Sequence, residues 1–504
     1  MAIRKPTPED LKRLAEANHF ELAEDELEGY QLMISALFDS YDVLDQMPET
    51  KEPLKYPDRD SGMRPTLEMD PYNAILRQCR LPGASGGKLN GKRIGLKNNI
   101  NVAGMPMTCA SKVLEGYIPE TDATIVTRLL DAGGDVVALL NLDNFAYSGA
   151  GDTSSFGPTL NPHNTDHLAG GSSGGSAAAL YYDYIDMTIG GDQGGSIRIP
   201  ASFCGVVGHK PTHGLVPYTG IVGIDNTFDH TGPMTRTVAD AALMLEVLAG
   251  KDPLDPRQGE VPVQAYTESL GLGAGGIRIG VLQEGFGLPE SEADVDAGVQ
   301  KALGILGELG AQQESVSVPF HQRSAGIVWS LISEGGTAAL RSNGLGHGWA
   351  GVYNAGLADA MGKGLKTQSK DLSPQAKLVL LVGSYMTDQY NGRMYAKAQN
   401  ARRDLRKAYD NLLERYDVLA MPTTPMKAHR NDANSDSGAI LTHGWDMTSN
   451  TAPFNMTGHP AISIPCGKSN GLPIGLMIVG KHFDDAMVLR VANAFEQHTN
   501  WESL

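Results

Sequence analysis

The sequence predicts an α/β fold, with a central mixed β-sheet flanked by helices and a helical extension at the N-terminus. Two features carry this prediction. Between residues 93 and 142, apolar strand-like segments alternate with an amphipathic helical segment, which is typical of parallel strands with helices packed on the sheet. Between residues 418 and 479, short apolar segments separated by turn residues indicate further strands.

Residues 1–71 are expected to form a helical arm followed by a linker. Thr7 is a suitable N-cap, and Pro8 suits the first position of the helix that follows it. A second helix is indicated by apolar residues that step by three and four positions: Leu27, Tyr30, Ile34, Leu37 and Tyr41. Because this apolar face needs either the main body or a second subunit to pack on, we expect the arm to support a homodimer. Prolines recur between residues 47 and 72, as in a linker that runs over a surface.

The body of the chain is expected to run from residue 72 to residue 504, with room for a smaller lobe around residues 255–415. Apolar runs and turn residues predict strands at 93–96, 136–142, 185–189, 277–282, 418–421, 461–465 and 474–479. Helical patterns and caps predict helices at 123–132, 174–182, 240–248, 293–309, 325–339, 374 to about 415 with breaks, and 485–496. The polar residues 161–167 are expected to form a loop.

The composition disfavours several classes of protein. A formal net charge of −17 argues against nucleic-acid binding, which requires clustered Lys and Arg to neutralise phosphates. The first ten residues lack the apolar core of a secretory signal, and no run of about 18 apolar residues indicates a membrane span. The cysteines lie far apart and form no metal-binding pair: Cys79, Cys109, Cys204 and Cys466. We therefore expect a cytoplasmic protein with reduced thiols, no metal, and no nucleic-acid or membrane partner.

Two glycine-serine clusters, separated by one apolar segment, lie between Gly170 and Pro200. Such clusters often form flexible linkers, but the apolar helix-like and strand-like segments beside them indicate a packed unit. A phosphate-binding loop would need a lysine after its last glycine, and Ser176-Ala177 supplies none. Residues 170–174 fit the GxSxG motif of α/β-hydrolases, yet the polar residues 161–167 do not form the preceding strand that this motif requires.

A lysine is a better candidate for the catalytic base than any histidine, because no motif places a His-Asp pair beside these serines. Lys97 follows a short strand-like segment, where burial would lower its pKa and make the neutral amine available as a base. Position alone also fits a surface lysine at the end of a strand. With Ser172 and Ser196, one from each cluster, Lys97 forms a candidate set of nucleophile, relay and base.

On these motifs the chain resembles the amidase signature family of serine hydrolases. The resemblance runs from about Asn73 to the C-terminus and rests on ordered blocks: FGPTLNP from Phe156, GGSSGGS at 170–176, GGDQGGSIRIP at 190–200, FCGVVGHKPT from Phe203, GPMTR from Gly232, MPTTP from Met421 and GLPIGL from Gly471. The DQGGS form and the helical extension are most similar to the nitrile-hydratase-associated, enantioselective amidases. The resemblance implies that residues 72–504 form the catalytic domain.

The resemblance also implies roles for individual residues. Ser196 would be the nucleophile, Ser172 the relay serine preceded by a cis peptide bond, and Lys97 the base. The oxyanion would be bound by the backbone N–H groups of Gln193, Gly194, Gly195 and Ser196. Supporting positions would be Gly171, Ser173, Asp192 and Arg198, the last two bracing the loop. The acyl pocket would include Tyr147, Phe228 and Trp329, and the chain departs from many relatives at Gln193 and Met477.

The implied activity is hydrolysis of small aliphatic or aromatic carboxamides to a carboxylic acid and ammonia, without a cofactor. Three alternatives remain open at this point: hydrolysis of anilides, carbamates or urethanes; a glutamine-dependent transamidation component that works with a charged transfer RNA; and a binding scaffold without activity. No arginine is clearly placed to bind a substrate carboxylate, which disfavours glutamine.

Overall fold

The computed structural model describes residues 3–49, 53–346, 348, 350–432 and 437–504, arranged in two compact units, Met1–Pro53 and Leu54–Leu504. The sequence placed the end of the arm and linker at residue 71. In the structure the second unit begins earlier, because strand β1 (Asp60–Met63) already pairs with β2 (Ile75–Leu81). Residues 50–52 of the expected linker lie outside the described residues.

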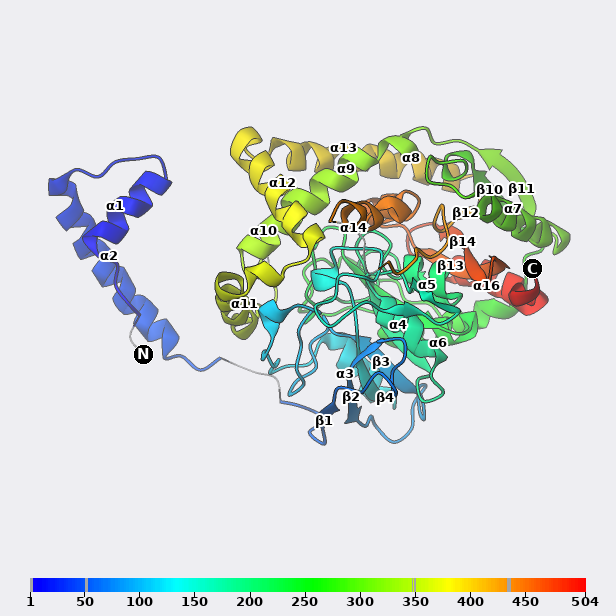
Figure 1. Cartoon of the computed structure of the whole chain (residues 1–504), viewed down its shortest axis with the longest axis horizontal. Coiled ribbons are helices and arrows are strands. Elements are labelled where there is room, and N and C mark those ends of the chain that lie inside the picture. The colour runs from blue at the N-terminus through cyan, green and yellow to red at the C-terminus, as the bar shows by residue number, and fades with distance from the viewer. Residues whose placement is uncertain (1–2, 50–52, 347, 349, 433–436) are drawn as a thin grey trace. The chain divides into compact units, whose positions relative to one another are not determined.

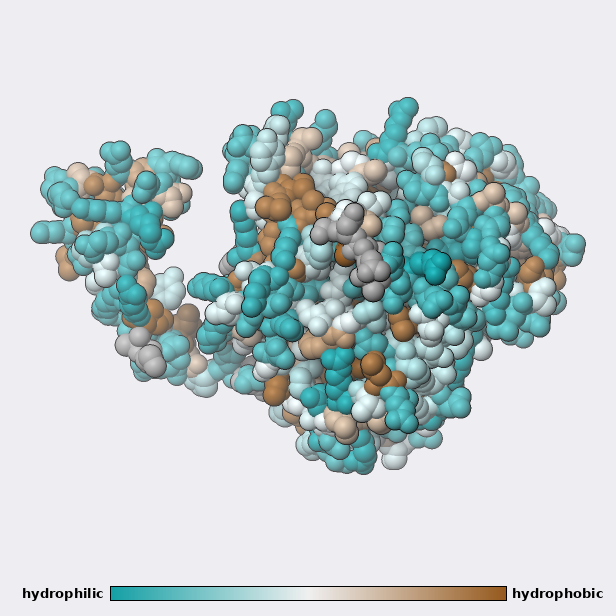
Figure 2. Space-filling model, in the orientation of Figure 1, coloured by the Kyte–Doolittle hydropathy of each residue, from teal (hydrophilic) through white to brown (hydrophobic). Residues whose placement is uncertain are grey.

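The first unit consists of helices α1 (Pro8–Ala17) and α2 (Glu24–Asp45). The predicted cap of α1 is confirmed: Thr7 Oγ1 accepts a hydrogen bond from the N–H of Asp10, and the Asp10 carboxylate accepts one from the N–H of Thr7. The apolar face of α2 is only partly covered, since Leu27 is buried while other members of that face are exposed: Tyr30, Leu37 and Tyr41. Brown apolar atoms are accordingly visible among the polar surface of this unit (Figure 2).

The second unit contains one mixed sheet, which confirms the predicted α/β class (Figure 1). In spatial order its twelve described strands are β1, β2, β4 (Asp135–Leu140), β3 (Arg93–Lys97), β7 (Met187–Asp192), β9 (His230–Thr235), β8 (Val207–Lys210), β13 (Ala461–Ser469), β14 (Leu472–Gly480), β12 (Val418–Pro422), β10 (Arg278–Leu282) and β11 (Gln312–Val316). Strands β4, β3 and β7 are parallel, and so are β12, β10 and β11. The strands between these two groups pair in antiparallel fashion.

Helices cover both faces of this sheet. On one face lie α3 (Thr124–Asp131), α6 (Val238–Leu248), α7 (Ala293–Glu308) and α16 (Asp485–His498). On the other face lie α4 (Gly174–Ala178) and α5 (Arg198–Cys204). Side chains of β4 supply both cores, because Val136 packs with the first group and Leu140 with the second.

The remaining helices form a layer beyond the sheet that encloses a second large apolar cluster. They are α8 (Phe320–Arg323), α9 (Ala325–Ser330), α10 (Gly336–Arg341), α11 (Ala355–Thr367), α12 (Pro374–Tyr390), α13 (Arg393–Leu413), α14 (Ser437–His443) and α15 (Ala452–Thr457). The expected helix at 325–339 is interrupted by a π-helical turn, Leu331–Gly335. Residues 255–415 form no unit of their own, since β10 and β11 extend the central sheet.

The expectation that residues 161–167 form a loop is wrong. They belong to a hairpin of β5 (Leu160–Asn161) and β6 (Asn164–Leu168) rather than to a loop. The polar side chains are satisfied locally: Asn161 Nδ2 donates hydrogen bonds to the carbonyls of Leu168 and Phe203. None of the described helices combines the length and apolar character needed to cross a bilayer.

Candidate active site

The central parallel strands bring the candidate residues to one edge of the sheet. Lys97 is the last residue of β3, and Asp192 is the last residue of the neighbouring strand β7. Because parallel strands end at the same edge, the turn that follows β7 lies beside Lys97. That turn carries Ser196 and leads into α5.

Lys97 is fully buried and contacts the first glycine-serine cluster. Its Nζ donates a hydrogen bond of 2.7 Å to Ser172 Oγ and another of 3.3 Å to the carbonyl of Gly191. The peptide bond between Gly171 and Ser172 is cis. A Cβ atom on Gly171 would lie 1.9 Å from Asp143 Oδ2, so only glycine fits at this position.

The two glycine-serine clusters are hydrogen-bonded to each other. The N–H of Ser173 donates to the carbonyl of Ser196 at 3.2 Å. Ser173 Oγ donates to the carbonyl of Gly191 at 3.1 Å and accepts from its N–H at 3.2 Å. The structure thus joins Lys97 to Ser172 by a hydrogen bond and holds the backbone of Ser196 beside Ser173, which links the two loops.

The protonation of Lys97 follows from its surroundings. Burial lowers the pKa of the Lys97 amine to about 7, although the carboxylates of Asp143 and Asp192 oppose this shift. Asp143 was not identified from the sequence. Its backbone N–H donates to the carbonyl of Ser172 at 3.1 Å, and its carboxylate accepts hydrogen bonds from Thr153 and from the N–H of Gly151.

Asp192 and Arg198 brace the turn between β7 and α5 from within the core. The two side chains are fully buried and paired, with Arg198 Nε 3.0 Å from Asp192 Oδ2 and Nη2 3.0 Å from Oδ1. Burial would raise the pKa of Asp192, but the guanidinium outweighs it and holds the pKa at about 2. Arg198 also donates to Asn455 Oδ1 and to the sulfur of Met477, one of the positions that departs from many relatives.

One of the four expected oxyanion donors is already bonded to the carboxylate of Asp192. This carboxylate accepts hydrogen bonds from the N–H groups of Gly195, at 2.8 Å, and Ile197, at 3.1 Å. The Gly195 N–H is therefore committed to the brace and is not available to an oxyanion. Within the described residues, the N–H groups of the other three expected donors have no such partner: Gln193, Gly194 and Ser196.

A small cavity lies against Ser196. Its lining consists of Ala146, Ser148, Gly149, Gln193, Gly194, Ser196, Ile199, Ile224, Ile332, Trp445 and Thr448. The three expected pocket residues are not among them: Tyr147 and Phe228 are buried in the core, and Trp329 reaches the site only through its ring contact with Trp445. The described lining carries no charged side chain.

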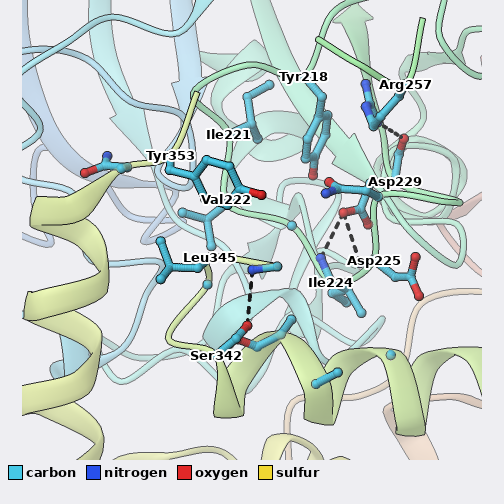
Figure 3. Close-up of a pocket in the computed structure, with 18 of the residues that line it drawn as sticks. Tyr218, Ile221, Val222, Ile224, Asp225, Asp229, Arg257, Ser342, Leu345 and Tyr353 are labelled. Atoms are coloured by element: carbon cyan, nitrogen blue, oxygen red, sulfur yellow. Dashed lines mark hydrogen bonds between the residues drawn. The ribbon is translucent and has the colours of Figure 1, made fainter. Parts of the chain in front are cut away.

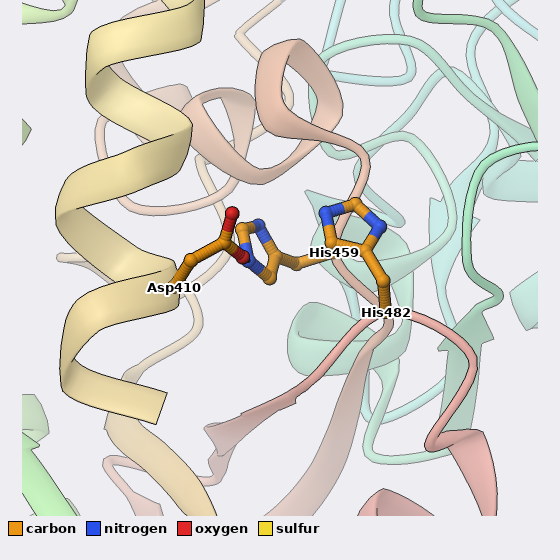
Figure 4. Close-up of side chains that lie close together, drawn as sticks. All are labelled: Asp410, His459 and His482. Carbon is orange, nitrogen blue, oxygen red and sulfur yellow. The ribbon is translucent and has the colours of Figure 1, made fainter. Parts of the chain in front are cut away.

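Two side-chain clusters contain the donor atoms that metals prefer. One is Asp410, His459 and His482 (Figure 4), and the other is His429, His443 and Asp446. In the first cluster both ring nitrogens of His459 are within hydrogen-bond distance of a partner, Nε2 at 3.0 Å from Asp410 Oδ1 and Nδ1 at 2.9 Å from Thr457 Oγ1. These hydrogen bonds account for His459 and Asp410, whereas the buried Nε2 of His482 has no hydrogen-bond partner within the described residues. Neither cluster includes a residue of the candidate triad.

With this geometry in place, comparison with known proteins identifies the family. Residues 68–489 match the family described as amidase. The chain belongs to the amidase signature family. This membership confirms the resemblance drawn from the sequence motifs and makes the chain a carbon–nitrogen hydrolase that acts on amides.

Relatives of this amidase include enzymes of different specificity. An enantioselective amidase from Rhodococcus rhodochrous is 40% identical over 501 residues, which cover 97% of this chain and 96% of that protein. A glutamyl-tRNA(Gln) amidotransferase subunit from Shouchella clausii is 38% identical over 449 residues, which cover 88% of this chain and 92% of that protein. The family is thus clear, while the reaction differs among similar proteins.

Solved structures share the fold. The corresponding glutamyl-tRNA(Gln) amidotransferase subunit from Thermotoga maritima superposes with a TM-score of 0.73 and 32% identity, over 86% of this chain and 90% of that chain. Native peptide amidase from Stenotrophomonas maltophilia superposes with a TM-score of 0.69 and 30% identity, over 82% and 84%. The large mixed sheet flanked by helices is therefore the fold of the family.

Proposed function

We propose that this amidase hydrolyses small aliphatic or aromatic primary carboxamides to a carboxylic acid and ammonia through an acyl-enzyme on Ser196. The observation that carries the proposal is the buried hydrogen bond of 2.7 Å between Lys97 Nζ and Ser172 Oγ. A lysine whose pKa is lowered to about 7 is partly neutral near neutral pH, so it is able to accept a proton.

The proposed reaction is a proton relay followed by covalent catalysis. Neutral Lys97 accepts the proton of Ser172, Ser172 accepts that of Ser196, and Ser196 Oγ attacks the amide carbon. The N–H groups of Gln193, Gly194 and Ser196 donate to the oxygen on which negative charge develops. The C–N bond then breaks, and the relay returns a proton to the leaving ammonia. Water attacks the resulting ester by the same relay, which releases the acid and restores Ser196.

The substitution Ser196→Ala tests this proposal. We expect ammonia release from benzamide and propionamide to fall by about 10⁴-fold or more, because the nucleophile is lost. Wild-type protein should be labelled by a fluorophosphonate at Ser196, and the variant should not. Ser154→Ala is the matched control and should retain activity. It changes a loop serine whose hydroxyl oxygen accepts a hydrogen bond from the backbone N–H of Phe156. Ammonia release by Ser196→Ala at the wild-type rate would contradict the proposal.

A second candidate is glutaminase activity within a transamidation complex, which the similarity to the glutamyl-tRNA(Gln) amidotransferase subunits favours. The described lining beside Ser196 offers no cation for the carboxylate of glutamine, so we rank this candidate second. Comparing ammonia release from glutamine and from benzamide decides between the two. Hydrolysis of acetanilide or a carbamate in preference to either amide would indicate the remaining alternative specificity.

We also propose that the arm, Met1–Pro53, forms a homodimer. The support is the exposed apolar face of α2, where Tyr30 is 50%, Leu37 57% and Tyr41 54% exposed. Such a face is costly to leave in water unless it is covered by a partner. The similarity to the Rhodococcus enzyme covers 97% of this chain, so it includes most of the arm.

A further inference from the structure

A cluster of two histidines and one aspartate lies apart from the cavities near Ser196. A cavity of about 630 Å³ shares Ile224 with the small cavity at Ser196 (Figure 3). Asp410, His459 and His482 line neither of these two cavities. The cluster is therefore a candidate for a site other than the one at Ser196.

The fold brings the two histidines together at one end of the β13–β14 pair. These strands are antiparallel, with Ala461 opposite Val479, so the residues just before β13 and just after β14 lie at the same end. His459 and His482 occupy these positions, and their ring centroids are 4.2 Å apart. Asp410 comes from the last turn of α13, and Figure 4 shows its carboxylate beside the ring of His459. Three segments that are far apart in the sequence thus meet in this cluster.

The spacing of the three side chains is close to that of a metal site. One donor atom from each residue lies within 4.8 Å of the other two, and Asp410 Oδ1 is 3.0 Å from His459 Nε2. In a tetrahedral zinc site with bonds of about 2.1 Å, the ligand atoms are about 3.4 Å apart. The half-buried ring of His482 therefore has only a short way to move for all three residues to hold one ion.

Hydrogen bonds leave one nitrogen of this cluster without a partner. His482 Nε2 is buried and has no hydrogen-bond partner within the described residues, whereas buried polar atoms are normally paired. Burial and repulsion from His459 lower the pKa of His482 to about 2, and burial also lowers the pKa of His459. Both rings are therefore neutral, which is the form of imidazole that binds a metal.

The surroundings of His459 allow the tautomer that a metal ligand requires. The Thr457 hydroxyl has one proton and lies 3.1 Å from the carbonyl of Pro453 and 2.9 Å from His459 Nδ1. When the hydroxyl donates to Pro453, His459 Nδ1 donates to Thr457, and Nε2 presents a lone pair towards Asp410. Such a second hydrogen bond is usual for a metal-binding histidine. In the other tautomer Nε2 donates to Asp410, and the ion is excluded.

The charge and the access of the cluster also suit a cation. Asp410 supplies a carboxylate, and its side chain is 43% exposed, so an ion is able to enter from the solvent. The nearest guanidinium, that of Arg406, is 3.5 Å from the other carboxylate oxygen, Oδ2, and is itself 51% exposed. Burial lowers the pKa of Lys210 well below its ordinary value, so that amine adds little positive charge. His482 also lines a cavity of about 330 Å³, which has room for a water ligand.

We propose that Asp410, His459 and His482 bind one divalent transition-metal ion such as Zn²⁺, with water as the fourth ligand. Two imidazoles and one carboxylate form a donor set that zinc prefers. The ion ties the last turn of α13 to the β13–β14 pair and so fastens the outer helical layer to the sheet. The expectation of no metal rested on the scattered cysteines, which take no part in this site.

Titration of the full chain with Zn²⁺, after a chelator has removed bound metal, tests the proposal. We expect the wild type to bind Zn²⁺ at this site with a Kd of about 1 µM or lower. His482→Gln and Asp410→Asn should each weaken this binding by about 100-fold or more, since even residues behind the ligands contribute about 10- to 100-fold. His443→Gln is the matched control, because it changes only the other cluster and should leave this affinity unchanged.

Melting temperatures measured with and without Zn²⁺ give a second readout. Zn²⁺ should raise the melting temperature of the wild type and of His443→Gln but not that of His482→Gln, because an ion that binds only the folded state stabilises it. An equal response of the wild type and His482→Gln, wild-type affinity in both ligand variants, or loss of binding in His443→Gln would overturn the proposal. Neither measurement uses amide hydrolysis, so the outcome does not depend on the proposed function.

Discussion

Lys97 shows how burial creates reactivity in a single residue. The amine lies at the end of a central strand, where desolvation lowers its pKa to about 7 despite the nearby carboxylates of Asp143 and Asp192. A lysine at the end of an exposed strand would stay protonated near neutral pH. The proposed base is therefore partly neutral near pH 7 only because the neighbouring strands bury Lys97.

This pKa predicts the pH dependence of the reaction. Below about pH 7 Lys97 is protonated and unable to accept a proton, so kcat/KM should rise about tenfold per pH unit and level off above that value. Initial rates with benzamide, measured across a range in which the fold is intact, check this expectation. A flat profile through neutral pH, or a midpoint near 10, would show that Lys97 is not the base.

Part of the site could be predicted from individual residues, and part could not. Lys97, Ser172 and Ser196 were predicted from the glycine-serine motifs and the family resemblance. In the structure Lys97 donates to Ser172, and the backbone of Ser196 is bonded to the neighbouring Ser173. Asp143 and Trp445 have no local signal, because they reach the site only through tertiary packing. The role of the Gly195 N–H depends on where the Asp192 carboxylate lies, which spacing alone does not define.

At the scale of one element, the turn between β7 and α5 is held by a buried ion pair. Asp192 fixes the turn through two backbone N–H groups and is itself held by Arg198 and Asn455. A buried charge left without its partner is far more costly than a broken surface pair. The geometry of the proposed oxyanion site therefore depends on Asp192, although Asp192 need not touch the substrate.

Asp192→Asn should lower the free energy of unfolding by about 3 kcal/mol, because Arg198 would remain buried without a counter-charge. Urea unfolding measures this change, and kcat should fall as the turn loses its brace. Asp58→Asn is the matched control, since the Asp58–Arg80 pair is largely exposed and should contribute less than about 1 kcal/mol. Equal stability of the two variants would contradict the role given to the pair.

The elements that the sequence predicted best are those with strong apolar periodicity, such as β3, α7 and α16. Strands β8 and β9 were not predicted, because His209, Lys210 and His230 interrupt any apolar pattern. Their burial is made possible by specific partners: Lys210 Nζ donates to the carbonyl of His459, and His209 Nε2 lies 3.0 Å from Asp485 Oδ1. Pattern alone does not reveal such partners.

At the scale of the whole molecule, the arm, Met1–Pro53, and the catalytic unit, Leu54–Leu504, have different surfaces. The catalytic unit encloses several apolar clusters, whereas α2 leaves much of its apolar face exposed. The fold class and the order of most elements in the catalytic unit were predictable from sequence patterns. The boundary after Pro53 was not, because β1 has a short polar sequence that becomes a strand only by pairing with β2.

Replacing the exposed apolar residues of α2 should convert the protein from a dimer to a monomer. Light scattering of the wild type should give twice the chain mass of 53.7 kDa, and the variant Tyr30→Ser, Leu37→Ser, Tyr41→Ser should give one chain mass. Glu28→Ser with Asp45→Ser, at exposed polar positions of the same helix, should remain dimeric. A monomeric wild type would contradict the homodimer.

The order of the strands has a consequence for how this enzyme matures. Lys97, Ser172 and Ser196 come from three separate segments, and β3 and β7 become neighbours only when residues 93–192 have closed a parallel crossover. A chain in which β3 and β7 are not yet neighbours does not bring Lys97 beside the turn that carries Ser196. With the proposed relay, enzyme turnover reports when the central strands of a newly made or refolding chain have reached their native register.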